Sequence, residues 1–187
     1  PDGTFETLAN VPGAITVTPQ ACGTSQNFLD WPDATGASSY SIYNASGGAF
    51  IGNSIGSNYT HLGAPSTSYT YYVRANNDAG AQSANSANSS PATTPGPCLI
   101  PTVTSPTSAS ITQTTATLGA NVTSNGGSAL TARGTYWGTT ANPSTNILAE
   151  GLLTTGVFTH ARSGMLPGTS YFYRGYATNA VGTGYSP

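Results

Sequence analysis

Short runs of alternating, β-branched or aromatic residues recur along the chain, and clusters of glycine, proline, asparagine and serine separate them. We find no helical 3.6-residue period that lasts three turns. Turn signals follow one another about every 8 to 12 residues, a spacing typical of a β-sandwich. The pattern therefore predicts an all-β chain.

The predicted strands fall into two sets. Those of the first half are Ala14–Thr18, Gln26–Trp31, Ser39–Tyr43, Ala49–Gly52, Ser57–His61, Ser68–Asn76 and Ser83–Ser89. Those of the second half are Ser108–Thr112, Ala116–Val122, Ala132–Trp137, Asn146–Ala149, Gly156–Ala161 and Ser170–Ala177. Two halves of similar length thus carry one plan.

The clearest internal match pairs Ser68–Gly80 with Ser170–Gly182, since both are aromatic strands that lead to an asparagine-containing turn and a glycine. At these residues the chain resembles fibronectin type III domains, in which the late strand begins with a tyrosine that anchors the preceding loop. The resemblance implies two tandem immunoglobulin-like (fibronectin type III) β-sandwiches. It also implies that Tyr69 and Tyr171 are the corner tyrosines and that Trp31 lies in the first core. The second half departs from the family by having no tryptophan on its second strand.

Proline marks the boundary between the halves. We assign residues 11–96 to the first domain, 97–101 to a proline-rich linker and 102–187 to the second domain. Residues 1–10 precede the first domain and belong to none of its seven strands.

The second domain is expected to lack its final strand, because its sequence stops soon after the asparagine turn. The chain opens instead with an alternating segment that reads as a final strand without a domain: Thr4, Phe5, Glu6, Thr7 and Leu8. Joining the end of the chain to residues 2–8 restores an ordinary ending. We expect either one period of a tandem array or a subunit that lends this strand to a neighbour. The alternative is that the chain has arbitrary ends.

Charge is scarce. Only 5% of residues are charged and the net charge is -2, with four arginines and no lysine. This density is too low to neutralise phosphates or to hold anionic lipids, so nucleic acid and membrane surfaces are poor partners. The sequence also holds no run of about 20 apolar residues that would insert into a bilayer.

The two cysteines, Cys22 and Cys98, have no nearby cysteine or histidine at metal-ligand spacing. We expect a disulfide rather than two free buried thiols, since the other features are typical of an extracellular protein. No metal or other cofactor is predicted.

The carboxylates are scattered, and only Asp30 and Asp33 are near each other in sequence. They flank a strand end, where turn chemistry explains them better than catalysis or calcium. A serine or cysteine nucleophile would need a histidine base, and the sequence has no Gly-x-Ser-x-Gly elbow. We therefore predict no enzymatic activity.

Four asparagines begin an Asn-x-Ser/Thr sequon and are candidate glycosylation sites. They are Asn44, Asn58, Asn88 and Asn121.

These observations predict a non-catalytic structural repeat of an extracellular filament, sheath, stalk or surface adhesin, whose partners are copies of itself joined head-to-tail. The alternative is a spacer or carbohydrate-binding accessory module of a secreted polysaccharide-degrading enzyme, with glycans as partners.

Overall fold

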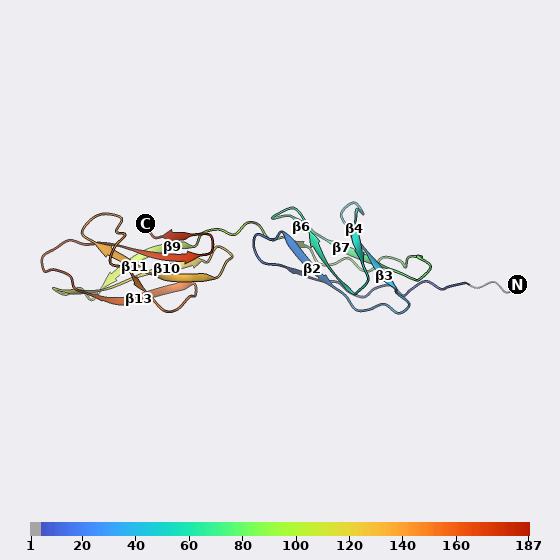
Figure 1. Ribbon diagram of the computed structural model, residues 1–187, viewed down its shortest axis with the longest axis horizontal. Helices are drawn as coiled ribbons and strands as arrows, with labels where there is room; N and C mark the ends of the chain where they lie inside the picture. Colours follow the sequence, from blue (N-terminus) through green and yellow to red (C-terminus); the bar gives the residue numbers. More distant parts are fainter. Residues whose placement is uncertain (1–4) are drawn as a thin grey trace. The chain divides into compact units, whose positions relative to one another are not determined.

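The structure is a computed structural model that describes residues 5–187. The chain forms two compact units, Pro1–Pro97 and Cys98–Pro187, whose strands are labelled in Figure 1. The described residues form strands, turns and bends but no helix, and so none that is long and apolar enough to cross a membrane.

The first unit is a sandwich of two main antiparallel sheets, with strand orders β1-β2-β5 and β4-β3-β7, and a two-stranded ladder β6-β8. Its strands are β1 (Thr16–Pro19), β2 (Gln26–Asp30), β3 (Ser39–Asn44), β4 (Phe50–Ser54), β5 (Asn58–Leu62), β6 (Ser68–Tyr69), β7 (Tyr71–Asn76) and β8 (Ala92–Thr93). Strand β7 alternates fully buried and half-buried residues, as expected for a strand with one face in the core.

Side chains from both main sheets form the core of the first unit. Leu29 of β2, Ile42 of β3 and Val73 of β7 are fully buried, and Trp31 is 3% exposed. The ring of Trp31 packs edge-to-face on Tyr40 at 5.4 Å between centroids. The core tryptophan predicted from the sequence is therefore confirmed.

The second unit has sheets of order β13-β10-β9 and β12-β11-β14-β15. Its strands are β9 (Thr102–Ala109), β10 (Thr115–Ser124), β11 (Leu130–Gly138), β12 (Leu148–Ala149), β13 (Gly156–Ser163), β14 (Phe172–Asn179) and β15 (Thr183–Tyr185). Val103, Val122 and Phe158 lie in its core, and Figure 1 shows β9, β10 and β13 within this unit.

Both units pack a three-stranded sheet on a second sheet that contains the late strand, β7 in the first unit and β14 in the second. This is the arrangement of a fibronectin type III-like sandwich, so the predicted all-β fold is confirmed. The corner tyrosines are confirmed as well. The hydroxyl of Tyr69 accepts a hydrogen bond from the Ala64 amide at 3.0 Å, and that of Tyr171 accepts one from the Leu166 amide at 2.8 Å.

The structure corrects the sequence analysis at three strands. The predicted strand Ser108–Thr112 ends at Ala109 and begins earlier, because Val103 enters the core whereas Ile111 is 72% exposed. The predicted strand Ser83–Ser89 is not a β-strand. The second unit has a short final strand, β15, which pairs with the end of β14.

Cys22 and Cys98 are disulfide-bonded, and they are the chain's two cysteines. The bridge closes a loop that contains nearly the whole first sandwich. A loop of this length stabilises the folded state by about 4 kcal/mol on the loop-entropy model.

Candidate functional site

The free edge of β7 in the first unit is covered by a segment with a serine at every third residue. Each serine donates its backbone N–H to a β7 carbonyl at 2.8 to 2.9 Å and accepts the N–H of the same β7 residue on its Oγ at 3.0 Å. The pairs are Ser83 with Ala75, Ser86 with Val73 and Ser89 with Tyr71. We call this segment the serine ladder. Its three-residue period is that of polyproline II rather than of a β-strand.

Strand pairing resumes beyond the serine ladder. In the short strand β8, Ala92 lies opposite Tyr69 and Thr93 lies opposite Ser68. The amide of Thr94 then donates to the Thr67 carbonyl at 2.9 Å. The late strand of the first unit is therefore covered from end to end.

The corresponding edge in the second unit is covered only in part. Strand β15 pairs with Tyr176–Thr178 of β14. Ser186 then repeats one rung of the serine ladder, since it donates its amide to the Gly175 carbonyl at 2.9 Å and accepts the Gly175 amide on Oγ at 2.9 Å. Among residues 5–187, none pairs with this edge of β14 before Gly175. The backbone N–H and C=O of Tyr173 point to the same side as those of Gly175 and are left on an open sheet edge, whereas Phe172 pairs with Gly138 of β11.

An apolar hollow of about 190 Å³ lies beside this open edge. The side chains that line it include Ile111, Leu118, Trp137, Met165, Tyr171 and Tyr173. Tyr173 is half-buried, whereas Tyr71, its counterpart on β7, is fully buried.

In the first unit, a polar side chain fills the position that corresponds to the apolar hollow of the second unit. Asn27 of β2 lies opposite His61, as Leu118 of β10 lies opposite His160, so Asn27 and Leu118 occupy corresponding positions. The Asn27 amide donates to the Tyr71 hydroxyl at 3.0 Å and to the Ala92 carbonyl at 3.3 Å. A polar residue there is bonded to the last strand, while Leu118 faces an empty apolar space. We call the open edge of β14 together with this hollow the docking site.

The predicted donor strand lies near the first unit. Phe5 is 91% exposed and Leu8 is 60% exposed. Glu6 and Thr7 bond to the turn after β7: the Ala79 amide donates to Glu6 Oε2 at 2.9 Å, and Asn77 Nδ2 donates to the Thr7 carbonyl at 2.9 Å. Residues 5–8 form no strand within their own chain, and Thr4 lies outside the described residues.

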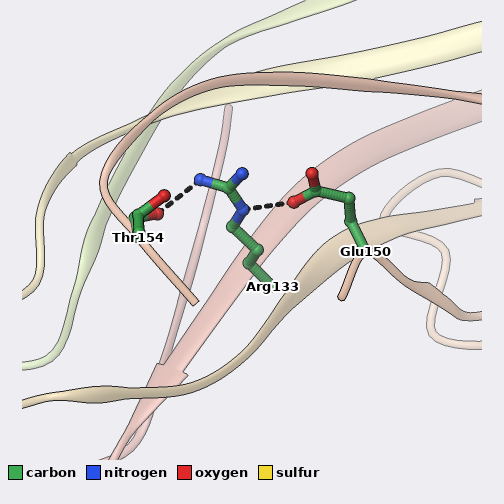
Figure 2. Close-up of polar contacts among 3 residues, drawn as sticks. All are labelled: Arg133, Glu150 and Thr154. Carbon is green, nitrogen blue, oxygen red and sulfur yellow. Dashed lines mark hydrogen bonds and ion pairs between the residues drawn. The ribbon is translucent and has the colours of Figure 1, made fainter. Parts of the chain in front are cut away.

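Two arginines are buried in the second unit, which the sequence analysis did not anticipate. Figure 2 shows Arg133, whose Nε forms an ion pair with Glu150 Oε2 and whose Nη1 donates to the Thr154 carbonyl. Its guanidinium also lies 5.1 Å from the centroid of the Phe158 ring. These contacts hold the segment after β12 against β11, and they have a structural role.

The second buried arginine, Arg162, bonds to neutral groups. Its Nε donates to Thr135 Oγ1 at 3.1 Å and its Nη2 donates to the Asn146 carbonyl at 2.8 Å. His160 lies next to it, with Nε2 at 2.6 Å from the same Thr135 Oγ1 and with a buried Nδ1 that has no partner among the described residues. Burial and the positive charge of Arg162 lower the pKa of His160, and Glu150 partly opposes them.

The described residues hold no cluster of three or more His, Cys, Asp or Glu side chains that would bind a metal. His61 lies with Nδ1 at 2.9 Å from the Tyr71 hydroxyl, and burial lowers its pKa. His61 is half-buried, and its partner Tyr71 belongs to the core of the first unit.

The candidate glycosylation sites differ in exposure. Asn58 and Asn88 are exposed, whereas Asn44 and Asn121 are half-buried. Asn44 Oδ1 accepts the Ser46 amide at 3.0 Å. The exposed pair remain the better candidates for modification.

An aromatic cluster on the first unit bears on glycan binding. The rings of Tyr43 and Tyr72 stack on each other at 4.9 Å, and the guanidinium of Arg74 lies 5.5 Å from the Tyr43 centroid. Phe50 packs edge-to-face on Tyr43. Neighbouring side chains thus occupy ring faces that a sugar would need.

No protein-family model matches the chain, and no curated protein matches it. Solved structures do resemble it. The crystal structure of FN3tt is 26% identical with a TM-score of 0.38, covering 46% of this chain and 97% of that one. The FN1–FN3 domains of chicken CNTN1 are 18% identical with a TM-score of 0.41, covering 95% of this chain and 66% of that one. A Yersinia enterocolitica family 28 exopolygalacturonase is 21% identical with a TM-score of 0.40, covering 46% of this chain and 21% of that one. Since these scores are low, the fold assignment depends on the strand order described above.

Proposed function

We propose that this chain is a non-catalytic structural module of an extracellular assembly, and that it joins to a further copy of itself at the docking site. The N-terminal segment of one copy would lie along the open edge of β14 in the next. Copies joined in this way are related head-to-tail, and head-to-tail contacts that do not close build filaments or stalks.

The partial covering of β14 is the observation that carries the proposal. The first unit displays the completed form of the same edge, with the serine ladder and β8 bonded along β7. The second unit has one rung at Ser186, and then an open edge beside an apolar hollow. An added strand would supply main-chain hydrogen bonds to the edge and a side chain to the hollow.

Two further features support an extracellular location. The disulfide is of the kind that persists in oxidising compartments. The charged fraction of 5% leaves a polar, nearly uncharged surface, which suits a spacer better than a binder of charged polymers.

The proposal is tested by deleting residues 1–8. We expect the deletion to abolish self-association in sedimentation velocity and to leave the first unit folded. A synthetic peptide of residues 1–8, added in excess to the deletion variant, should raise the melting temperature of the second unit in a concentration-dependent way. Fluorescence of Trp137 reports on that unit because its ring lines the hollow.

A scrambled peptide of the same composition is the control and should have no effect. The proposal fails if the deletion leaves association unchanged and the native peptide does not shift the second transition.

A further inference from the structure

The N-terminal segment has two parts that differ in what they contact. Phe5 projects into solvent, while the residues that follow are tied to the first unit. We infer that the segment divides between Phe5 and Glu6. Residues 2–5 enter the docking site of another copy, and residues 6–9 remain on their own first unit as the joint. The inference rests on the proposed head-to-tail assembly and specifies which residues carry it.

The joint and the residue that follows it make four contacts with their own unit. Besides the bonds of Glu6 and Thr7 described above, Ala9 is 6% exposed and packs in the first core. The Asn10 amide donates to the Thr35 carbonyl at 2.9 Å. A donor strand that included Glu6 and Thr7 would have to break these bonds, so the whole range of residues 4–8 does not serve as the donor.

The second unit holds its own incoming chain in the same way. Asn179, the counterpart of Asn77, donates through Nδ2 to the Leu99 carbonyl at 2.7 Å and to the Asn125 carbonyl at 2.8 Å. Upstream of Leu99, Thr94 is already buried in the first unit and bonded to Thr67. At this junction the chain passes from one sandwich to the asparagine of the next within a few residues. Thr7 corresponds to Leu99, because the carbonyl of each accepts a hydrogen bond from the matching asparagine of its unit. The residues just before Thr7 are therefore placed to belong to a preceding sandwich.

The first unit also indicates the register. Its covering segment advances by three residues per rung until Ser89, and Ala92 then lies opposite the corner tyrosine Tyr69. If residues 1–5 of another copy follow Ser186–Pro187 along the edge, the same step of three residues from Ser186 places Asp2 opposite Tyr173. A second step of three places Phe5 opposite the corner tyrosine Tyr171, as Ala92 lies opposite Tyr69.

Phe5 in this register takes the place that Ala92 has in the first unit. Phenylalanine is larger than alanine, and this difference in size agrees with what lies beneath each position. Asn27 fills the space beneath Ala92, whereas Leu118, Trp137 and Met165 leave a hollow. A phenylalanine side chain is the one large apolar group that residues 2–5 offer.

Two single substitutions separate the parts of the segment. Phe5→Ala removes the proposed anchor, and Leu8→Ala removes a second exposed apolar side chain within the joint. Both residues are exposed in the single chain, so neither change should unfold it. Phe5→Ala should weaken self-association in sedimentation velocity about 30-fold, the size of a typical interface hot spot. Leu8→Ala should change it less than about 3-fold.

A cysteine pair tests the contact directly, with the native disulfide retained. Phe5→Cys combined with Met165→Cys should give covalently linked copies under mild oxidation, visible on a non-reducing gel. Leu8→Cys with Met165→Cys is the matched control and should give few.

The outcomes distinguish the inference from the proposed function. Suppose that deletion of residues 1–8 abolishes association. If Leu8→Ala then weakens association as much as Phe5→Ala, or if Leu8→Cys crosslinks as well as Phe5→Cys, the division between Phe5 and Glu6 is wrong but the head-to-tail assembly stands. If the deletion has no effect, both are wrong.

Discussion

The two sandwiches share a strand order but differ in how each completes its late strand. In the first unit, side-chain hydroxyls of the serine ladder replace part of a backbone ladder, and the covering runs the length of β7. In the second unit, within residues 5–187, the same device appears once, at Ser186, and the rest of the β14 edge lies open beside apolar side chains. The comparison shows that the first unit supplies the template for a closed edge, and that the second has the space in which such a closure would fit.

The interiors differ as well. The first core is aromatic and aliphatic, with a neutral cluster of Asn27, His61 and Tyr71. The second buries the guanidinium groups of Arg133 and Arg162. The same fold therefore accommodates a neutral hydrogen-bonded cluster in one interior and two hydrogen-bonded guanidinium groups in the other.

The largest expected effect comes from removing the serine ladder. Replacing Ser83, Ser86 and Ser89 by alanine leaves three buried β7 amides without an acceptor. We expect each loss to cost about 1–2 kcal/mol, and all three together about 3–6 kcal/mol, in the free energy of unfolding of the first unit. Urea denaturation followed by Trp31 fluorescence, in a Trp137→Phe background, measures it.

Ser90→Ala is the control, because the Ser90 side chain is exposed. Because the second unit has one such serine among the described residues, we expect Ser186→Ala to lower its free energy of unfolding by only about 1–2 kcal/mol. A triple variant as stable as the parent chain would show that the hydroxyls do not replace the backbone ladder.

The serine ladder also shows what the sequence could and could not provide. The strand order followed from alternation and from the tyrosine motifs, because burial on one face imposes a two-residue period on the sequence. The segment Ser83–Ser89 was interpreted as a strand because it lies where a strand is needed. Its signal was the three-residue repeat of serine, which a search for two-residue alternation does not detect.

Only part of the proposed docking arrangement could be predicted from the sequence. The unassigned N-terminal segment and the incomplete covering of the last sheet were both expected from the sequence, since both expectations depend on counting strands. The anchoring of Glu6 and Thr7 by Ala79 and Asn77 is not, because it joins residues about 70 positions apart through a turn. The burial of Arg133 was missed for a similar reason, as its partner Glu150 comes from a different segment.

Breaking the disulfide should affect the first unit more than the second. Cys22→Ser with Cys98→Ser opens the loop that contains most of the first sandwich. We expect the first unit to lose about 2–4 kcal/mol of stability, because the unfolded chain regains conformational entropy. The transition reported by Trp137 should move by less than about 0.5 kcal/mol. Equal losses in both units would contradict this assignment of the bridge.

The ion pair of the second unit gives the converse test. Glu150→Gln leaves the Arg133 guanidinium, which is 3% exposed, without its carboxylate. We expect the free energy of unfolding of the second unit to fall by about 2–3 kcal/mol, because a buried charge is costly once its partner is gone. The loss stays moderate because the Glu150 position keeps some access to water. Hydrogen exchange of residues 148–163 should become faster while that of the first unit stays unchanged.

Glu6→Gln is the matched control in the first unit, where the carboxylate is exposed, and should have little effect on stability. Unchanged exchange in residues 148–163 of the Glu150 variant would show that the pair does not hold this segment.

The smallest expected effect is a dependence on pH that the two units carry through different histidines. Burial and the positive charge of Arg162 lower the pKa of His160, and the negative charge of Glu150 partly offsets them. Burial lowers the pKa of His61. Each unfolded unit binds a proton near the ordinary histidine pKa of 6.5, whereas the folded unit binds it only at lower pH. Stability should therefore be full above about pH 6.5 and decrease as the pH falls below it. Urea denaturation at pH 7.5 and pH 5, followed separately for each unit, measures the change. His160→Asn should reduce the dependence in the second unit alone and His61→Asn in the first alone. A second unit whose stability is the same at both pH values would show that His160 is not kept neutral by its surroundings.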